Sequence, residues 1–349
     1  MPPDLQAPFV YWGGKRKIAP LIWDILGDVP NYVEPFCGSC AILLARPGGP
    51  GRGELVNDID ANVVNCLRAL KHDPGQLAHL CDYPVTEVDM NAWHFWLMEP
   101  TRRTAFVTHL LADPEYYDLV RAARWLHGIN AFIGGGWCRD EGMWEYHHGS
   151  GSHLKSGIVK RTHIPHVSTL GTGIHKRMHI PQVGNLGRGI HKYSLREGQA
   201  QTMLQSMLDW FTALQERLRS VRMACGDWTR VVTPACITGL GLTGIVFDPP
   251  YSLEEDRDMR LYVHDDGAVA HAVRAWCLEH GDDPQLKIVM CGYGAIHDAL
   301  VQAGWTKYQW VGHAGYGNTG DQTRGQTNRK REAVYASPHC VPRAQLTFF

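Results

Sequence analysis

The chain has 349 residues and a formal net charge of −1, so no global excess of basic residues marks it as a nucleic-acid-binding protein, and any basic surface must be local. Its length suffices for one large α/β domain with an insertion, or for two domains. The 10 cysteines are scattered, and no second C-x-x-C accompanies Cys37 and Cys40, so we expect reduced thiols and no bound metal. The sequence shows neither a signal peptide nor an apolar run long enough to span a bilayer, and we expect a soluble, intracellular protein.

A Gly-Gly turn precedes the first predicted helix. Residues 11–15 read Tyr-Trp-Gly-Gly-Lys, and apolar residues at helical spacing follow from Ile18 to Ile25. Such a turn leaves backbone N–H groups and the positive end of a helix dipole facing a ligand, with Lys15 beside it. It could hold a carboxylate. An ordinary turn with solvated lysines is an equally good interpretation.

The next segment combines a turn of small residues with a spaced acid. Residues 34–40 read Glu-Pro-Phe-Cys-Gly-Ser-Cys, and small residues here let the backbone press against a ligand. Asp58 comes twenty residues after Gly38, at the end of a second predicted strand. That spacing suits an acid that bonds ribose hydroxyls at a neighbouring strand end.

Residues 151–196 have the most unusual composition in the chain. They contain no Asp or Glu but eight Lys and Arg residues, and Gly-Ile recurs at a period of 16 from Gly157. So few short copies cannot bury a core, so we expect small hairpins or loops with basic tips that contact phosphates and base edges. A disordered loop and a metal site through the histidines are the alternatives. The candidate nucleic-acid contacts are Lys160, Arg161, Lys176, Arg177, Asn185, Arg188 and Lys192.

The residues around this segment predict helices and strands in alternation. Helices are expected within 74–133, at 199–218, 268–278 and 295–303, and strands at 221–225, 286–291 and 332–337. This order favours a doubly wound sheet. The strand at 221–225 ends in Gly226-Asp227-Trp228, which is either a ligand contact or a plain strand-end turn.

The stretch Phe247–Ser252 follows a run of apolar residues typical of a buried strand. It places Asp248 at the carboxyl end of that strand, where open α/β sheets bind ligands. Pro249 and Pro250 fix the backbone and remove two N–H donors, which leaves a stiff loop rich in acceptors. A tight double-proline turn with an incidental aromatic residue is the alternative.

The chemistry that this loop suits is methylation of an amino group. A nucleobase amino group is a poor nucleophile, because its lone pair is conjugated into the ring, and it needs acceptors on both N–H bonds when it attacks a methyl group. Asp248 and the Pro249 carbonyl can be those acceptors, and Tyr251 offers a ring on which the base can stack.

Four motifs, in this order, resemble those of the alpha group of DNA N6-adenine methyltransferases: Y-W-G-G-K, E-P-F-C-G-S-C, the acid at Asp58, and D-P-P-Y at 248–251. The resemblance covers residues 9–75 and 220–340, and it implies an α/β fold with the Rossmann-like sheet of class I S-adenosylmethionine-dependent methyltransferases. The chain departs from the family at Cys40, where the usual F-x-G-x-G loop ends in glycine. Cysteine is small, but backbone strain there could weaken cofactor affinity.

The resemblance also implies roles for individual residues. Base binding and catalysis are implied for Asp248, Pro249, Pro250 and Tyr251. Contacts to S-adenosylmethionine are implied for Tyr11, Trp12, Lys15, Glu34, Phe36, Gly38, Asp58, Asp227 and Trp228.

The function implied is site-specific methylation of adenine N6 in double-stranded DNA, in a bacterial or phage-infected cell, as part of restriction-modification or phage modification. The base should be flipped, because a stacked amino group cannot lie between Asp248 and the Pro249 carbonyl. We expect a catalytic domain at 1–75 and 200–349, with 76–199 inserted for target recognition. The alternatives are an amino group of cytosine, RNA or protein as acceptor, or a catalytically silent DNA-binding protein.

The last five residues, Gln-Leu-Thr-Phe-Phe, resemble the short peptides that dock on bacterial sliding clamps. Packing of this tail on its own domain is the favoured alternative.

Overall fold

The structure is a computed structural model, and it describes residues 5–9, 11, 15–131, 137–138, 144–147, 157–160, 203–250, 268–309 and 332–342. The chain divides into two compact units, which we call the sheet unit (residues 1–7, 11–60 and 217–349) and the helical unit (residues 8–10 and 61–216). The functional division expected from the sequence, with an insertion at 76–199, stays a prediction.

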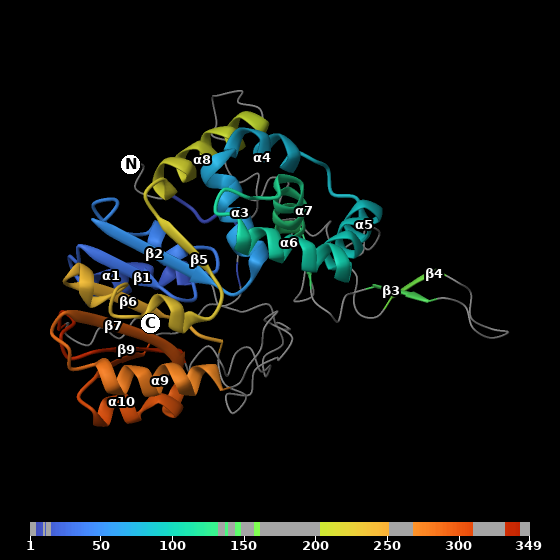
Figure 1. Cartoon of the computed structure of the whole chain (residues 1–349). Helices are drawn as coiled ribbons and strands as arrows, with labels where there is room; N and C mark the ends of the chain where they lie inside the picture. Colours follow the sequence, from blue (N-terminus) through green and yellow to red (C-terminus); the bar gives the residue numbers. More distant parts are fainter. Residues whose placement is uncertain are drawn as a thin grey trace. The chain divides into compact units, whose positions relative to one another are not determined.

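Seven strands of the described residues pair in one sheet in the sheet unit. They are β1 (Asn31–Glu34), β2 (Gly53–Asp58), β5 (Arg222–Cys225), β6 (Thr243–Phe247), β7 (Leu286–Tyr293), β8 (Thr306–Gln309) and β9 (Glu332–Ala336). Their order is β5-β2-β1-β6-β7-β9-β8 (Figure 1). The pairs from β5 to β7 are parallel, whereas β9 runs antiparallel to both of its neighbours. This is the Rossmann-like α/β sheet predicted from the sequence.

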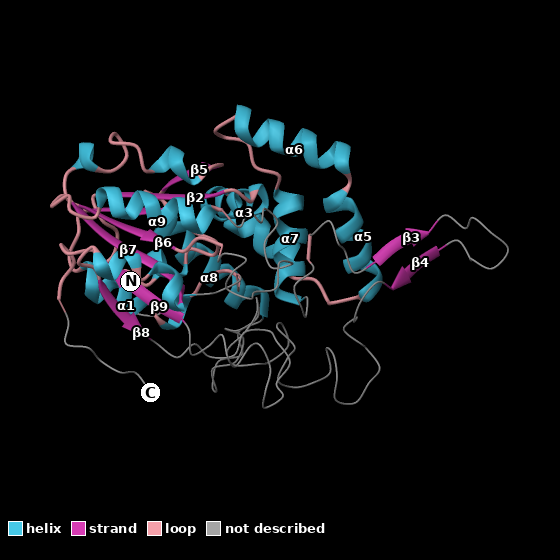
Figure 2. Cartoon of the chain, turned by 90° about the horizontal axis from the view of Figure 1, so that it is seen from below, coloured by secondary structure: helices cyan, strands magenta, loops and turns pink. Residues whose placement is uncertain are grey.

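The central strands read as continuous apolar runs because both faces of the sheet are covered. Ile245 and Phe247 of β6 pack in one apolar cluster with Val273 and Cys277 of α9 (Val269–His280). On the other face, a Cβ at Gly244 would lie 2.9 Å from a methyl of Val29, just beyond α1 (Ala19–Leu26). Figure 2 shows α1 and α9 on opposite sides of β6 and β7.

Short helices complete the sheet unit. They are η1 (Lys15–Lys17), α2 (Ala41–Leu44), η2 (Trp228–Val231), η3 (Thr238–Leu240), η6 (Gly294–His297) and α10 (Ala299–Gln302). Of these, η1 and α2 matter for the site because each follows one of the turns that the sequence singled out.

The helical unit is built around α7 (Leu119–Ala131), which contacts several neighbouring helices (Figure 1). The other helices are α3 (Ala61–His72), α4 (Pro74–Cys81), α5 (Glu87–Met98), α6 (Pro100–Ala112) and most of α8 (Met203–Leu218). A two-stranded antiparallel pair, β3 (Trp144–His147) with β4 (Gly157–Lys160), includes the first Gly-Ile of the basic repeat. None of the helices in the described part of the chain is both long and apolar enough to cross a membrane.

Candidate active site

The carboxyl ends of the parallel strands bring four acidic residues to one edge of the sheet. Glu34 is the last residue of β1 and Asp58 the last of β2, while Asp227 and Asp248 follow β5 and β6. The strand order reverses between β1 and β6, so this edge is the switch point at which open α/β sheets bind ligands. We therefore take it as the candidate active site.

Asp248 forms an ion pair with Lys15. The lysine Nζ lies 2.8 Å from Oδ1 of Asp248, and the two side chains are 4% and 19% exposed. Burial raises the pKa of Asp248, and the ammonium of Lys15 opposes that rise. Lys15 therefore favours the ionised carboxylate, which is the form that accepts hydrogen bonds from an amino group.

Asp58 is fixed by backbone groups on both of its oxygens. Gly38 N–H donates to Oδ2 and Asp60 N–H donates to Oδ1, each at 2.9 Å. Burial and the carboxylate of Asp60 raise the pKa of Asp58 to about 7. Since each oxygen has two lone pairs, the carboxylate retains the capacity to accept hydrogen bonds from hydroxyls.

Gly38 meets two requirements that only glycine meets well. Its φ of +46° is left-handed, and a Cβ there would lie 2.6 Å from Cδ1 of Tyr11. The Tyr11 ring thus packs directly on the loop backbone.

Cys40 occupies the position at which the family has glycine, and the structure gives the physical reason for that glycine. Its φ and ψ are 58° and 25°, a left-handed conformation that costs about 1–2 kcal/mol for a residue with a Cβ. Its side chain is fully buried, and α2 begins at the next residue.

Glu34 is a buried acid that interacts with the rest of the site. It is 2% exposed, and the Tyr32 hydroxyl donates to its Oε2 at 3.0 Å. Burial raises the pKa of Glu34 to about 8; hydrogen bonds from Tyr32 and the Leu43 backbone oppose the rise, and the carboxylates of Asp248 and Asp58 add to it. Glu34 is therefore mostly protonated at neutral pH.

Of the two predicted site residues after β5, Asp227 lies at the exposed edge of the sheet and Trp228 lies in the core. Asp227 is exposed, and its Oδ1 accepts the Thr229 N–H at 2.9 Å. Trp228 is only 8% exposed and packs against Phe36, with ring centroids 6.3 Å apart, and edge-on against Phe247. Most of the Trp228 side chain is thus covered by other residues of the core.

Sequence reasoning missed two residues at this edge. Ile59 lies between Asp58 and Asp60, and its side chain is 47% exposed. An apolar residue directly after a strand-end acid was the available signal. The Nδ2 of Asn57 donates to the carbonyls of Pro35 (2.9 Å) and Gly226 (3.0 Å), so it joins the loops that follow β1 and β5. Its partners lie far apart in sequence, so no local pattern could reveal them.

Several predicted site residues lie outside the described part of the chain. They are Trp12, Tyr251, Arg161, Lys176, Arg177, Asn185, Arg188 and Lys192. For Lys160 the structure describes the backbone, which ends strand β4. The histidines of the alternative metal site in the basic repeat also lie outside it. Among the described residues, no group of three or more potential metal-ligating side chains occurs.

The site as a whole is acidic and suits a positively charged ligand. Glu34, Asp58 and Asp248 are close enough for the other two carboxylates to affect the pKa of Glu34. Lys15 is paired with one of them. A cation bound beside these acids would be favoured, because it relieves their mutual repulsion.

Two comparisons found known proteins that are similar to part of this chain. Residues 11–117 match the family model described as D12 class N6 adenine-specific DNA methyltransferase. The Type II methyltransferase M1.LlaDCHI of Lactococcus lactis subsp. cremoris is 35% identical over 75 residues, which are 21% of this chain and 25% of that protein. The chain thus matches about a quarter of the length of this curated relative. Over residues 11–117 the chain is thus similar to the D12 class of N6 adenine-specific DNA methyltransferases, the resemblance that its motifs predicted.

Proposed function

We propose that the chain is a site-specific DNA methyltransferase that transfers a methyl group from S-adenosylmethionine to the N6 amino group of adenine. The observation that carries the proposal is the position of Asp248. It follows β6 at the switch point, it is paired with Lys15, and it lies at the same edge as Asp58 and its loop.

The residues present fit the cofactor. Its sulfonium and ammonium groups suit the acidic edge, and the hydroxyls of its ribose suit Asp58. Gly38 lets the Tyr11 ring pack on the loop backbone, and the exposed side chain of Ile59 offers an apolar surface for the adenine ring. The full set proposed to hold it is Tyr11, Trp12, Lys15, Glu34, Phe36, Gly38, Asp58, Ile59, Asp227 and Trp228. When bound, S-adenosylmethionine supplies the activated methyl group.

Asp248 and the loop after it act on the acceptor base. One oxygen of Asp248 is held by Lys15, and the other is available for one N–H of the amino group, while the Pro249 carbonyl takes the second N–H. The amino nitrogen would become positively charged as it accepts the methyl group, while the methyl–sulfur bond breaks and its electron pair stays on the departing thioether sulfur. The carboxylate stabilises that charge, and the surplus proton leaves through it to solvent. Tyr251 is proposed to stack on the base.

Lys15 contacts the carboxylate of Asp248, whereas the sequence alone indicated only a contact with the ligand. A free lysine at this turn would bind the carboxylate of the cofactor. Paired at 2.8 Å, it orients Asp248 and favours its ionised form. The ammonium has three N–H donors, so Lys15 can bond to the carboxylate of Asp248 and to the carboxylate of the cofactor at the same time.

We propose that the DNA is double-stranded and that the target adenine is flipped out of the helix into this site. Recognition of the target sequence is assigned to residues 76–199 and their basic repeat, through Lys160, Arg161, Lys176, Arg177, Asn185, Arg188 and Lys192. The similarity to the Lactococcus protein, a Type II methyltransferase, supports a place in restriction-modification. Docking of the C-terminal tail on a sliding clamp is a further proposal, which a pull-down with and without residues 345–349 tests.

The test is single-molecule sequencing of DNA from cells that express the chain, read for adenine and cytosine modification at every site. N6-methyladenine at one short motif is expected, and it should be absent with Asp248→Ala. The Asp248→Ala protein should still bind DNA, which separates loss of chemistry from loss of folding. N4-methylcytosine instead would shift the acceptor to cytosine. An unmodified genome together with cofactor binding would favour an RNA or protein acceptor, or a silent DNA-binding protein.

A further inference from the structure

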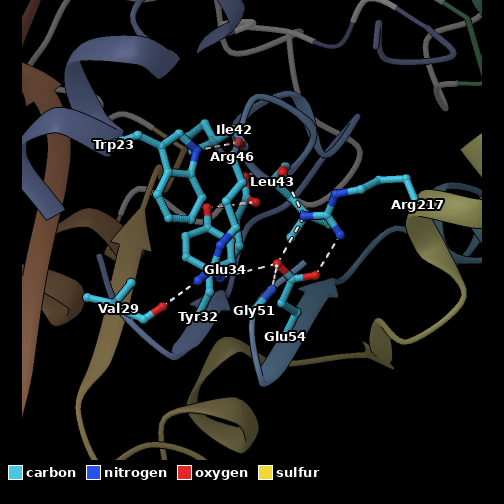
Figure 3. Close-up of polar contacts among 10 residues, drawn as sticks. All are labelled: Trp23, Val29, Tyr32, Glu34, Ile42, Leu43, Arg46, Gly51, Glu54 and Arg217. Atoms are coloured by element: carbon cyan, nitrogen blue, oxygen red, sulfur yellow. Dashed lines mark hydrogen bonds and ion pairs between the residues drawn. The ribbon is translucent and has the colours of Figure 1, made fainter. Parts of the chain in front are cut away.

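A buried carboxylate of the sheet unit is shared by two arginines (Figure 3). Glu54 of β2 is 2% exposed. Its Oε2 lies 2.6 Å from Nη1 of Arg217, and its Oε1 lies 2.9 Å from Nη2 of Arg217 and 3.2 Å from Nη1 of Arg46. The Gly51 N–H also donates to Oε1, at 3.1 Å. The carboxylate is therefore well satisfied, and its pair with Arg217 is bidentate.

The two arginines differ in their other partner. Arg217 also donates from Nη2 to the carbonyl of Leu43, at 2.9 Å, within α2. Arg46 donates instead to the carbonyl of Val29, and its guanidinium lies over the Trp23 ring, 5.0 Å from the centroid. Of the two side chains that share Glu54, Arg217 is the one that bonds to α2.

This bond matters because α2 is a single turn of helix. So short a helix has few internal hydrogen bonds, and its carbonyl groups need partners from elsewhere. Besides the backbone N–H groups of Arg46 and Ala45, the Leu43 carbonyl accepts from Arg217, and the Ile42 carbonyl accepts from Nε1 of Trp23, at 2.7 Å. The position of α2 in turn fixes the loop before it, whose Gly38 N–H holds Asp58.

Leu43 also connects this contact to an acid of the site. Its carbonyl accepts from Arg217, and its backbone N–H provides one of the hydrogen bonds that stabilise ionised Glu34. The Tyr32 hydroxyl also bonds to the same carboxyl. Figure 3 shows the contacts of Arg217 with Glu54 and Leu43, and the same view contains Tyr32 and Glu34.

We infer that Arg217 is a positioning residue for the cofactor site. It holds α2, and with it the loop that ends at Cys40, in fixed register with β2, the strand that carries Asp58. The inference rests on the proposed function, because it names a residue that sets affinity for S-adenosylmethionine. Arg217 reaches the site through Leu43 and Glu54 and makes no contact of its own with the reacting groups.

The test replaces Arg217 by lysine in the full chain. Lysine keeps the positive charge beside Glu54, but all its donors lie on one nitrogen, so it cannot reproduce the contacts that two separate guanidinium nitrogens make with Glu54 and with the Leu43 carbonyl. The matched control is Arg46→Lys, which perturbs the same carboxylate but not the bond to α2. Titration calorimetry with S-adenosylmethionine, without DNA, measures Kd, and thermal unfolding measures stability.

We expect Arg217→Lys to raise the Kd about tenfold, the factor typical of losing one charge-assisted hydrogen bond, and Arg46→Lys to change it less than about twofold. With DNA present, the KM for S-adenosylmethionine should rise while kcat at saturating cofactor and the KM for DNA stay unchanged. A merely structural role would lower the unfolding temperature of both variants and leave both Kd values at that of the unaltered chain. That result would overturn the inference.

The outcomes separate this inference from the proposed function. If the unaltered chain does not bind S-adenosylmethionine, the proposed function fails first. If Arg217→Lys does not fold, Glu54→Gln with Arg217→Gln removes one buried charge of each sign, and the glutamine side chain is too short to reach Leu43. This double variant should show the same rise in Kd, and an unchanged Kd would refute the positioning role.

Discussion

Replacing Gly38 by alanine should destabilise the sheet unit through two separable effects. The φ of +46° is left-handed, which costs about 1–2 kcal/mol for a residue with a Cβ. The new Cβ would also lie 2.6 Å from Cδ1 of Tyr11, 3.2 Å from its Cγ and 3.4 Å from its Cβ. The severe overlap is with the Tyr11 ring, which must leave its packed position to relieve it. Overpacking of this kind costs about 1–3 kcal/mol, so the total expected loss is about 2–5 kcal/mol.

The chain offers a matched control for the backbone effect. Gly48 has a φ of +75°, but nothing lies within 4 Å of a Cβ placed there. Gly48→Ala should therefore lose only about 1–2 kcal/mol. Adding Tyr11→Ala to Gly38→Ala should recover the part that comes from overlap. Urea denaturation of the four proteins, followed by circular dichroism, measures these differences.

The same substitution should weaken the cofactor site. The Gly38 N–H holds Asp58, so displacement of the loop by Tyr11 should raise the Kd for S-adenosylmethionine in Gly38→Ala and leave it unchanged in Gly48→Ala. Equal losses of stability in the two alanine variants, with no recovery on removing the Tyr11 ring, would show that the close contact does not exist. The reasoning about the loop would then be wrong.

Three further predictions concern charge. Lys15→Met removes the cation that opposes the rise in the pKa of Asp248, so the acid limb of a kcat profile should move to higher pH; an unshifted limb would exclude Asp248 as the group that must be ionised. The pKa of Glu34 is raised from 4.5 to about 8, so the stability that its protonation provides is present below pH 4.5 and is lost as the pH rises through 8. Glu34→Gln should therefore flatten the fall in unfolding temperature between pH 5 and 9, measured by calorimetry. Neutralising three basic residues of the repeat should weaken DNA binding and reduce the slope of log K against log salt by about 2.7. An unchanged slope would show that these residues do not contact the DNA phosphates. The three are Lys176, Arg177 and Arg188.

Much of the fold could be predicted because the central strands are short apolar runs bounded by turns. The run that ends at Phe247 and the strands expected near 54–57, 286–291 and 332–337 all occur. β8 was missed because its burial alternates weakly and its residues, Thr-Lys-Tyr-Gln, are mostly polar. The helix expected at 295–303 is instead a 3-10 turn followed by α10, which is only four residues long. Boundaries of this kind depend on packing that no local pattern records.

Motif spacing located the acids of the site, but not their partners. Asp58 follows Gly38 by twenty residues because the one-turn helix α2, a loop and strand β2 lie between them, and the two residues do bond. The partner of Lys15 could not be deduced, because Asp248 lies far along the chain and meets it only through the strand order. The same holds for Glu54 and Arg217, which are 163 residues apart. Long-range ion pairs follow from topology, and local sequence does not encode them.

The acids of the site fall into two groups. Asp248 is paired with Lys15, whereas burial is the largest influence on Glu34 and Asp58. Asp248 has a cation of its own, which opposes the rise that burial causes in its pKa. For Glu34 and Asp58 the largest influence is burial, which raises their pKa values to about 8 and about 7. A cationic cofactor would lower both values and so release protons when it binds. Its affinity should therefore rise between pH 6 and 9, whereas the pH limb of turnover at saturating cofactor follows Asp248. Glu34→Gln should therefore shift the pH dependence of cofactor affinity and leave the pH limb of turnover in place, whereas Lys15→Met should shift the limb of turnover.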